Sequence, residues 1–213
     1  MPGINTTLGY IEQNGCYLML HRVKKENDLN HDKWIGIGGK FEDKESPEDC
    51  MLRETLEETG LTLTHMEYRG IVTFVSDEYE TEYMHLFWAD EFTGDIRECD
   101  EGVLEWIPKE KLRGIPKWEG DDIFLDLLEK KVPFFSLKLR YQGDILAEAV
   151  LNGTPLPTQS GAGEGCPKNG RLFTEISRFP GNLHYNVEEI KLNIHLAEKI
   201  ERGTEELVWH IRF

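Results

Sequence analysis

Three glutamates at helical spacing are the residues whose types and positions most suggest chemistry. Glu54, Glu57 and Glu58 stand at positions i, i+3 and i+4, so on a helix their carboxylates project from one face toward a common point. Magnesium prefers hard oxygen ligands, and a carboxylate cluster on a rigid helix supplies them. The alternative is an acidic helix face that contacts only water, and three glutamates by themselves favour that alternative.

The residues around these glutamates predict the elements that position them. Ser46 is the expected N-cap of a helix with Pro47 at its first position and Gly60 at its end,. The preceding segment, residues 27–40, gathers glycines, so its backbone can approach a ligand closely,. We expect a glycine-rich loop that leads into one helix. The predicted buried stripe of this helix comprises Leu52, Leu56 and Thr59.

The complete pattern resembles the Nudix box. That signature is a glycine, five residues, a glutamate, seven residues, Arg-Glu, an aliphatic residue, any residue, Glu-Glu, any residue, a glycine and an aliphatic residue. The corresponding residues here are Gly39, Glu45, Arg53, Glu54, Thr55, Glu57, Glu58, Gly60 and Leu61. Only Thr55 departs, at the position where an aliphatic residue is usual, and its methyl group can still pack.

The resemblance implies a divalent metal site. Glu54, Glu57 and Glu58 would bind Mg²⁺, with Mn²⁺ as a substitute, and the backbone carbonyl of Gly39 would donate a further oxygen. The same resemblance places Glu54 and Glu57 in the catalytic machinery together with Arg53 and Glu45. Arg53 can pair with Glu57 one turn later or with Glu45 from the loop, which would hold the carboxylates in place against their mutual repulsion.

A further carboxylate outside the box is Glu101, which precedes the expected strand Leu104-Glu105-Trp106. Related enzymes have an additional metal ligand or catalytic base at this place, so the resemblance makes Glu101 a candidate for both roles. The alternative is a turn residue beside Asp100. The sequence favours neither interpretation.

The resemblance covers roughly residues 5 to 151 and is strongest to the MutT-like group, which hydrolyses oxidised purine nucleoside triphosphates such as 8-oxo-dGTP. In that group a tryptophan and an acidic pair line the base pocket, and this chain offers Trp118, Asp121 and Asp122. An indole can stack on a purine while a carboxylate binds its polar edge. Alternatively, Trp118 is a core residue and the two aspartates only favour a helix N-terminus.

One position departs from that group: Ile35 stands where the mammalian members have an asparagine that contacts the base. The base specificity of the group therefore does not transfer as a whole.

The pattern of apolar and polar residues in the rest of the domain predicts the fold class. Hairpins are expected around Asn14-Gly15 and Gly143-Asp144, strands at 61–63, 70–75 and 83–89, and a helix at 121–130. These elements predict an α/β protein, a Nudix-type α/β/α sandwich with a mixed sheet.

The charge balance limits the partners. The 213 residues include 24 Lys and Arg and 40 Asp and Glu, for a net charge of -16. Such a surface repels phosphate, so a nucleotide substrate must be held by metal ions or by a local basic cluster, and a nucleic acid polymer is not an expected partner. Arg22 and Lys40 are candidate phosphate contacts, although exposed cations usually serve only solubility.

We expect a Nudix hydrolase domain at residues 1–152, a Gly/Pro-rich linker at 153–170 and a small C-terminal α/β extension of unknown role at 171–213,. Four scattered cysteines predict free thiols,. The chain lacks an apolar run of roughly 18 residues, so we expect a soluble cytoplasmic protein with no membrane partner. Monomer and homodimer both remain open.

The predicted function is Mg²⁺-dependent hydrolysis of a nucleoside triphosphate, 8-oxo-dGTP or a related oxidised purine nucleotide, to the monophosphate and pyrophosphate. This activity would sanitise the nucleotide pool and so support DNA repair. One alternative is hydrolysis of another nucleoside diphosphate-linked substrate such as ADP-ribose, because the box serves many substrates. A different class of function is a nucleotide-sensing regulator with a partner-binding tail, which the intact Glu54, Glu57 and Glu58 argue against.

Overall fold

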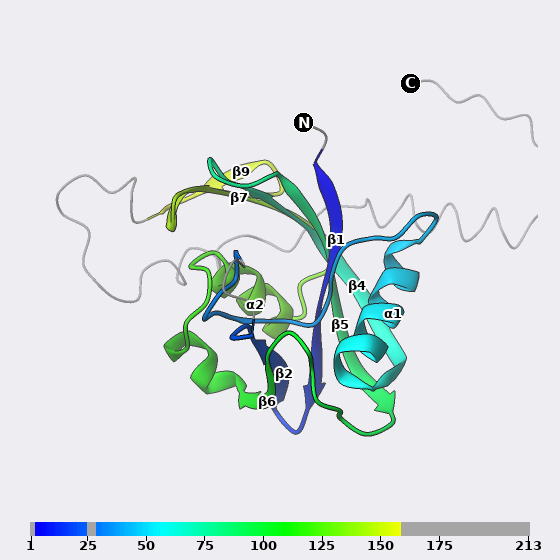
Figure 1. The fold of residues 1–213 in the computed structure, drawn as a ribbon. Helices are drawn as coiled ribbons and strands as arrows, with labels where there is room; N and C mark the ends of the chain where they lie inside the picture. The colour runs from blue at the N-terminus through cyan, green and yellow to red at the C-terminus, as the bar shows by residue number, and fades with distance from the viewer. Residues whose placement is uncertain (1–2, 25–28, 159–213) are drawn as a thin grey trace, which may run out of the picture. The chain divides into compact units, whose positions relative to one another are not determined.

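The fold is one large sheet with a helix on each face (Figure 1). The computed structural model describes residues 3–24 and 29–158. Its strands are β1 Ile4–Gln13, β2 Cys16–His21, β3 Trp34–Ile35, β4 Thr62–Val75, β5 Glu82–Thr93, β6 Val103–Pro108, β7 Phe135–Gln142, β8 Ile145–Leu151 and β9 Thr154–Leu156. Its helices are α1 Pro47–Thr59, a 3₁₀ helix Lys109–Gly114 and α2 Asp121–Glu129.

The sheet is mixed, with strand order β3-β2-β1-β5-β4-β7-β8-β9 and with β6 paired to β2. The pairs β1–β5 and β4–β7 are parallel, and the other pairs are antiparallel. Parallel partners need a long crossover between them. The chain between β1 and β5 contains α1, and the chain between β4 and β7 contains α2. The two parallel pairs therefore account for the two helices.

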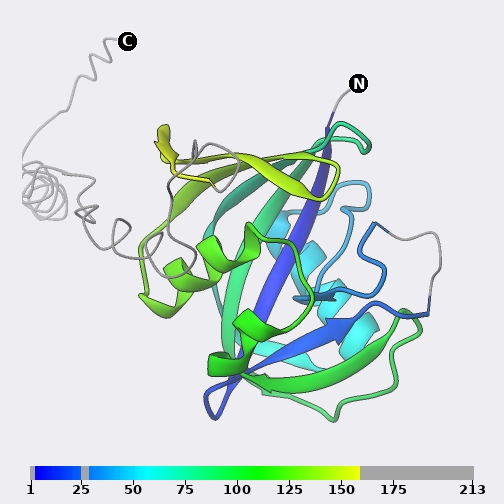
Figure 2. The same ribbon diagram turned by 90° about the vertical axis from the view of Figure 1, so that its left-hand side faces the viewer.

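The alternation of side chains along β1 shows that the helices cover opposite faces. Ile11 belongs to the buried cluster that contains Met51 of α1. Its neighbour Tyr10 points the other way, and its ring centroid lies 5.8 Å from that of Phe124 in α2. Figure 2 shows α2 in front of the strands and α1 behind them. The predicted α/β/α sandwich is confirmed.

Both predicted hairpins are present. Asn14 and Gly15, with φ of 52° and 75°, form the two-residue turn between β1 and β2, as expected for a dipeptide that tolerates positive φ. Gly143, with φ of 55°, lies in the turn between β7 and β8. The strand expected at 61–63 is the beginning of the long strand β4, which runs without a break to Val75.

Helix α1 begins and ends where the sequence predicts. The Ser46 hydroxyl accepts a hydrogen bond from the Asp49 backbone N–H, and the Asp49 carboxylate accepts one from Ser46 N–H, each at 3.1 Å. Such a capping box satisfies two N–H groups that a helix start otherwise leaves unpaired. At the other end Gly60 has φ of 79°, and its N–H donates to the Leu56 carbonyl. The helix is therefore fixed at both ends.

The predicted buried stripe of α1 is wrong for two of its three residues. Leu52 and Leu56 are 39% and 44% exposed. The residues that are buried in α1 are Cys50, Met51, Thr55, Glu58 and Thr59. The helix lies close to β1, because a Cβ added to Gly9 would lie 2.2 Å from the Met51 side chain. Thr55, the one departure from the box, packs fully buried, as predicted.

The first residues of the predicted linker belong to the sheet, because Thr154–Leu156 forms β9 and pairs with β8. The remainder of the linker, from residue 159, and the extension 171–213 lie outside the described residues. Within the described part of the chain, Cys16, Cys50 and Cys99 are free thiols. No helix there has the length and apolar character needed to cross a membrane.

Candidate active site

The glycine-rich loop before α1 runs alongside β1. Gly9 and Ile37 exchange two backbone hydrogen bonds, of 2.6 and 2.9 Å, and Thr7 N–H donates to the Gly39 carbonyl at 2.8 Å. Gly38 has φ of 152°, and a Cβ there would lie 2.2 Å from the Thr7 carbonyl oxygen. Only glycine fits so close to the neighbouring backbone. The loop is thereby held where its N–H groups and carbonyls meet the carboxylates of α1.

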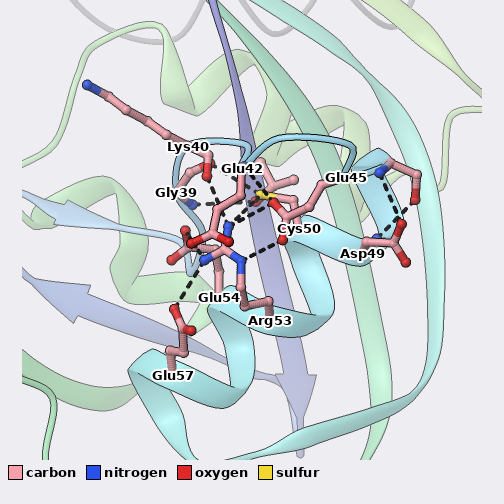
Figure 3. A network of polar contacts seen from close by, with 11 residues as sticks. Gly39, Lys40, Glu42, Glu45, Asp49, Cys50, Arg53, Glu54 and Glu57 are labelled. Atoms are coloured by element: carbon pink, nitrogen blue, oxygen red, sulfur yellow. Dashed lines mark hydrogen bonds and ion pairs between the residues drawn. The ribbon is translucent and has the colours of Figure 1, made fainter.

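Arg53 is the centre of the polar network between the loop and α1 (Figure 3). Its Nε and Nη2 donate to both oxygens of Glu45, at 2.6 and 2.9 Å. Its Nη1 donates to Glu54 at 2.8 Å and to Glu57 at 3.1 Å, and Nη2 also donates to the Lys40 carbonyl at 3.0 Å. Both pairings predicted for Arg53 are therefore present together, and the fork geometry of a guanidinium makes this possible.

The charges of this network depend on Arg53. The hydrogen bonds from Arg53 lower the pKa of Glu45 to about 2. Hydrogen bonds to Glu45 raise the pKa of Arg53 itself. Glu45 is therefore an anion at neutral pH that fixes the guanidinium from the loop side, while the guanidinium fixes Glu54 from the helix side.

Glu58 and Glu54 are the buried carboxylates of α1. Glu58 is 7% exposed and accepts a hydrogen bond of 3.1 Å from Gly38 N–H. Burial raises the pKa of Glu58 to about 8, an effect that the Gly38 N–H partly opposes. Burial also raises the pKa of Glu54. A Cβ on Gly39 would lie 2.3 Å from the Glu54 carboxylate, so the glycine makes room for this side chain.

Glu57 is placed differently from the other two glutamates. Its side chain is 60% exposed and its carboxylate is turned to Arg53. The three carboxylates therefore do not meet at one point, contrary to the geometry predicted from helical spacing. The reason is that Arg53 precedes Glu57 by one helical turn, where opposite charges attract. Across residues 3–24 and 29–158, no three His, Cys, Asp or Glu side chains are gathered as a ready-made metal site.

Glu101 lies beside the buried glutamates. Its negative charge contributes to the raised pKa values of Glu54 and Glu58. Its carboxylate forms an ion pair with Arg22. Glu101 lines one cavity with Glu54 and Glu58, so it stays a candidate for the additional carboxylate of the site.

That cavity has a volume of about 680 Å³, which suits a ligand of nucleotide size. We call Glu54, Glu58 and Glu101 the acidic part of the cavity. We call the rings of Tyr10, Phe74 and Trp118, together with Asp121, its aromatic part. Arg22, Lys40 and Gly39 also line it, as does Ile35. Arg22 and Lys40 therefore stay candidate phosphate contacts. Sequence reasoning missed Tyr10 and Phe74, because no pattern distinguishes them from ordinary buried strand residues.

Trp118 combines the two roles that the sequence left open. It packs edge-on against Phe74 and Tyr141, with ring centroids 5.3 and 4.9 Å away, as a core residue does. It also lines the cavity with 8% of its surface exposed. Its indole N–H donates to the Asn30 side-chain oxygen at 2.8 Å, and the Lys33 ammonium lies 4.3 Å from its ring centroid.

The predicted acidic pair divides between two sides of α2. Asp121 lines the cavity, and its burial raises its pKa to about 8. Asp122 does not line it and pairs instead with Lys117 at 3.0 Å. Consecutive helix residues point about 100° apart, which agrees with the different partners of the two side chains. Asp121 is therefore the member of the predicted pair that lines this cavity, and the base-pocket role of the pair stays a prediction.

Comparison with known proteins agrees with this site. The NUDIX domain model matches residues 7–128. The uncharacterized Nudix hydrolase YvcI of Bacillus subtilis is 35% identical over 46% of this chain and 65% of its own length, less than two thirds of that relative. The oxidized purine nucleoside triphosphate hydrolase of Danio rerio is 33% identical over 68% of this chain and 92% of its own length.

A solved structure gives the same assignment. The MutT protein of Bacillus halodurans superposes with a TM-score of 0.62 and 26% identity, over 70% of this chain and 97% of that protein. The residues matched by the family, 7–128, contain the glycine-rich loop, α1 and most of the residues that line the cavity. The chain therefore belongs to the Nudix hydrolase family, in its MutT-like group.

Proposed function

We propose that this chain hydrolyses an oxidised purine nucleoside triphosphate, such as 8-oxo-dGTP, to the monophosphate and pyrophosphate with Mg²⁺ as cofactor. The observation that carries the proposal is that the acidic part and the aromatic part line the same cavity. The first is suited to metal-bound phosphates and the second to a purine. The zebrafish relative named for hydrolysis of oxidised purine nucleoside triphosphates supports this choice of substrate.

The donor chemistry of the acidic part fits a divalent cation. Glu54, Glu58 and Glu101 offer carboxylate oxygens, and Gly39, whose carbonyl the resemblance implies as a further donor, lines the same cavity. Mg²⁺ usually completes its shell with water and substrate phosphates, so it does not require a full protein cage. When held by these residues, Mg²⁺ would neutralise phosphate charge and would lower the pKa of a water that attacks phosphorus. Glu57 is a further candidate ligand on the exposed side of α1.

The residues of the chain hold this arrangement in place. Arg53 holds the Glu54 carboxylate and the Gly38 N–H holds the Glu58 carboxylate, and both side chains line the cavity. Arg22 and Lys40 bring positive charge to a cavity whose carboxylates otherwise repel a triphosphate,. Arg22 in particular can exchange its ion pair with Glu101 for a phosphate oxygen,.

The aromatic part is suited to a modified purine. The Trp118 ring offers an apolar face, and Asp121 beside it is largely protonated at pH 7 because its pKa is raised to about 8. A neutral carboxyl donates one hydrogen bond and accepts another. It can therefore bind a base edge that presents both an acceptor and a donor.

The raised pKa of Asp121 predicts a pH dependence of substrate selection. The neutral form persists up to about pH 8, so kcat/KM for 8-oxo-dGTP should fall as the pH rises above that value, by about tenfold at pH 9. Asp121→Asn carries no titrating proton and should show a lower but flatter profile. Rate measurements between pH 6.5 and 9.5 compare the two, and an equal decline in both proteins would contradict the assignment.

Substrate identity is tested by kcat/KM over a panel of 8-oxo-dGTP, the unmodified nucleoside triphosphates and ADP-ribose. We expect 8-oxo-dGTP to be preferred, and Trp118→Ala to lose that preference more than it loses activity on unmodified nucleotides. A preference for ADP-ribose would instead support the diphosphate-linked substrate class. The regulatory alternative is addressed by a truncation after residue 158, because the β9 strand at 154–156 pairs with β8 and must be retained.

A further inference from the structure

Asn30 contacts Trp118 across a long sequence separation. The Asn30 side-chain oxygen accepts the indole N–H of Trp118 at 2.8 Å. Asn30 is also the one side-chain amide among the described residues that line the cavity. Ile35 lines the same cavity at the position where the resemblance implies an asparagine. Its side chain cannot form hydrogen bonds. The amide of this cavity is therefore supplied by a different residue.

The segment that carries Asn30 is anchored to the sheet. Lys33 N–H donates to the Asn30 carbonyl at 2.9 Å, and Arg22 N–H donates to the Lys33 carbonyl at 3.0 Å. His21 pairs with Asp32 at 2.9 Å and stacks on Trp34 with ring centroids 4.5 Å apart. These contacts fix the position of Asn30 relative to β2, so its oxygen is a stable acceptor for the indole.

The other contacts of the Trp118 side chain with the described residues include two aromatic rings and one ammonium group. Phe74 and Tyr141 pack against it edge-on, and Lys33 lies over its ring. Such contacts fix where a ring lies more strongly than they fix its rotation, whereas a hydrogen bond to the indole N–H has a preferred direction. The Asn30 contact therefore sets the orientation of the face that Trp118 offers to the cavity.

The geometry points to Asn30 as a positioning residue for substrate specificity: it orients Trp118 so that the indole forms one wall of the purine site. This inference rests on the proposed function and adds a specificity determinant to it. Asn30 acts through Trp118, so its effect should appear in KM for the nucleotide and in the preference between oxidised and unmodified purine. It should not appear in the bond-breaking step at the acidic part.

The test is a double-mutant cycle on the two partners, with kcat and KM for 8-oxo-dGTP and dGTP. Loss of one neutral hydrogen bond predicts that Asn30→Ala raises KM for 8-oxo-dGTP about five- to tenfold, with kcat nearly unchanged. Asn30→Asp keeps the acceptor oxygen and should preserve the preference for 8-oxo-dGTP over dGTP. Trp118→Phe removes the N–H and should raise KM comparably, and the double variant should be no worse than Trp118→Phe alone.

A second readout is calorimetric binding of the product 8-oxo-dGMP, with thermal unfolding to confirm that each variant is folded. Binding should weaken in parallel with KM. Additive effects in the double variant, or equal losses of preference in Asn30→Asp and Asn30→Ala, would overturn the positioning role. If the wild-type protein prefers another nucleotide, the proposed function fails, and the same cycle on that nucleotide tests Asn30 separately. A protein that neither cleaves nor binds any of these nucleotides overturns both.

Discussion

Replacing Glu58 with glutamine is expected to lower kcat by about 10³-fold or more. Glu58 is buried at the acidic part of the cavity and holds Gly38 through its carboxylate. Glutamine has nearly the same shape and can still accept that hydrogen bond, but it carries no charge for a divalent cation. Metal ions contribute several kcal/mol to the stabilisation of transition-state charge, and about 1.4 kcal/mol corresponds to tenfold in rate.

Stability should change little in this variant, because burial already disfavours the charged form of Glu58. The measurement is kcat at saturating Mg²⁺ together with the midpoint of thermal unfolding. Glu48→Gln is the matched control, since Glu48 is an exposed glutamate in the first turn of the same helix. A Glu58→Gln protein with kcat within tenfold of wild type would mean that Glu58 is not part of the reacting site.

Replacing Arg53 with lysine is expected to lower kcat about 10²-fold, because misplacement of reacting groups by about 1 Å has an effect of that size. The guanidinium bonds three carboxylates and one carbonyl at once, and an ammonium cannot reproduce that fork. We also expect the free energy of unfolding to fall by about 2 kcal/mol, since hydrogen bonds between charged groups contribute on this scale.

The Mg²⁺ dependence distinguishes this effect from the loss of a ligand. Arg53 positions Glu54 and Glu57 and does not itself bind the cation. A higher Mg²⁺ concentration should therefore recover part of the lost rate in Arg53→Lys. The same titration should recover little in Glu58→Gln. Equal responses to Mg²⁺ in the two variants would argue that Arg53 contacts the substrate directly.

The local features of the fold could be predicted from the sequence because neighbouring residues determine them. Ser46, Asp49 and Gly60 set the limits of α1 through their own hydrogen bonds and backbone angles, and Asn14-Gly15 sets a hairpin. The spacing of the Nudix box likewise predicted the partners of Arg53, because these residues lie close to it in the sequence. These features lie within one element or one loop and need no knowledge of the rest of the fold.

The features that sequence reasoning missed arise from contacts between distant segments. The buried face of α1 is decided by the close approach of Gly9 on β1, so Leu52 and Leu56 remain exposed although their spacing is helical. Asn30 contacts Trp118 across 88 positions of the chain, and no periodicity in the loop indicates this. The different surroundings of Asp121 and Asp122 could have been anticipated, because consecutive residues of a helix point about 100° apart.

The acidic composition of the chain is consistent with the cavity that it builds. Of the described residues that line the cavity, Arg22 and Lys40 are the two basic ones, whereas six are Asp or Glu. Phosphate binding by these residues alone is therefore electrostatically unfavourable. We therefore expect the nucleotide and the divalent cation each to raise the affinity of the protein for the other.

Product analysis with 8-oxo-dGTP in the presence of Mg²⁺ tests the central claim most directly. The account predicts equal amounts of 8-oxo-dGMP and pyrophosphate from the wild-type protein, and neither product above background from Glu58→Gln. Release of orthophosphate with 8-oxo-dGDP would contradict the proposed reaction. Cleavage of ADP-ribose without cleavage of any nucleoside triphosphate would contradict the proposed substrate, and unchanged product formation by Glu58→Gln would contradict the site.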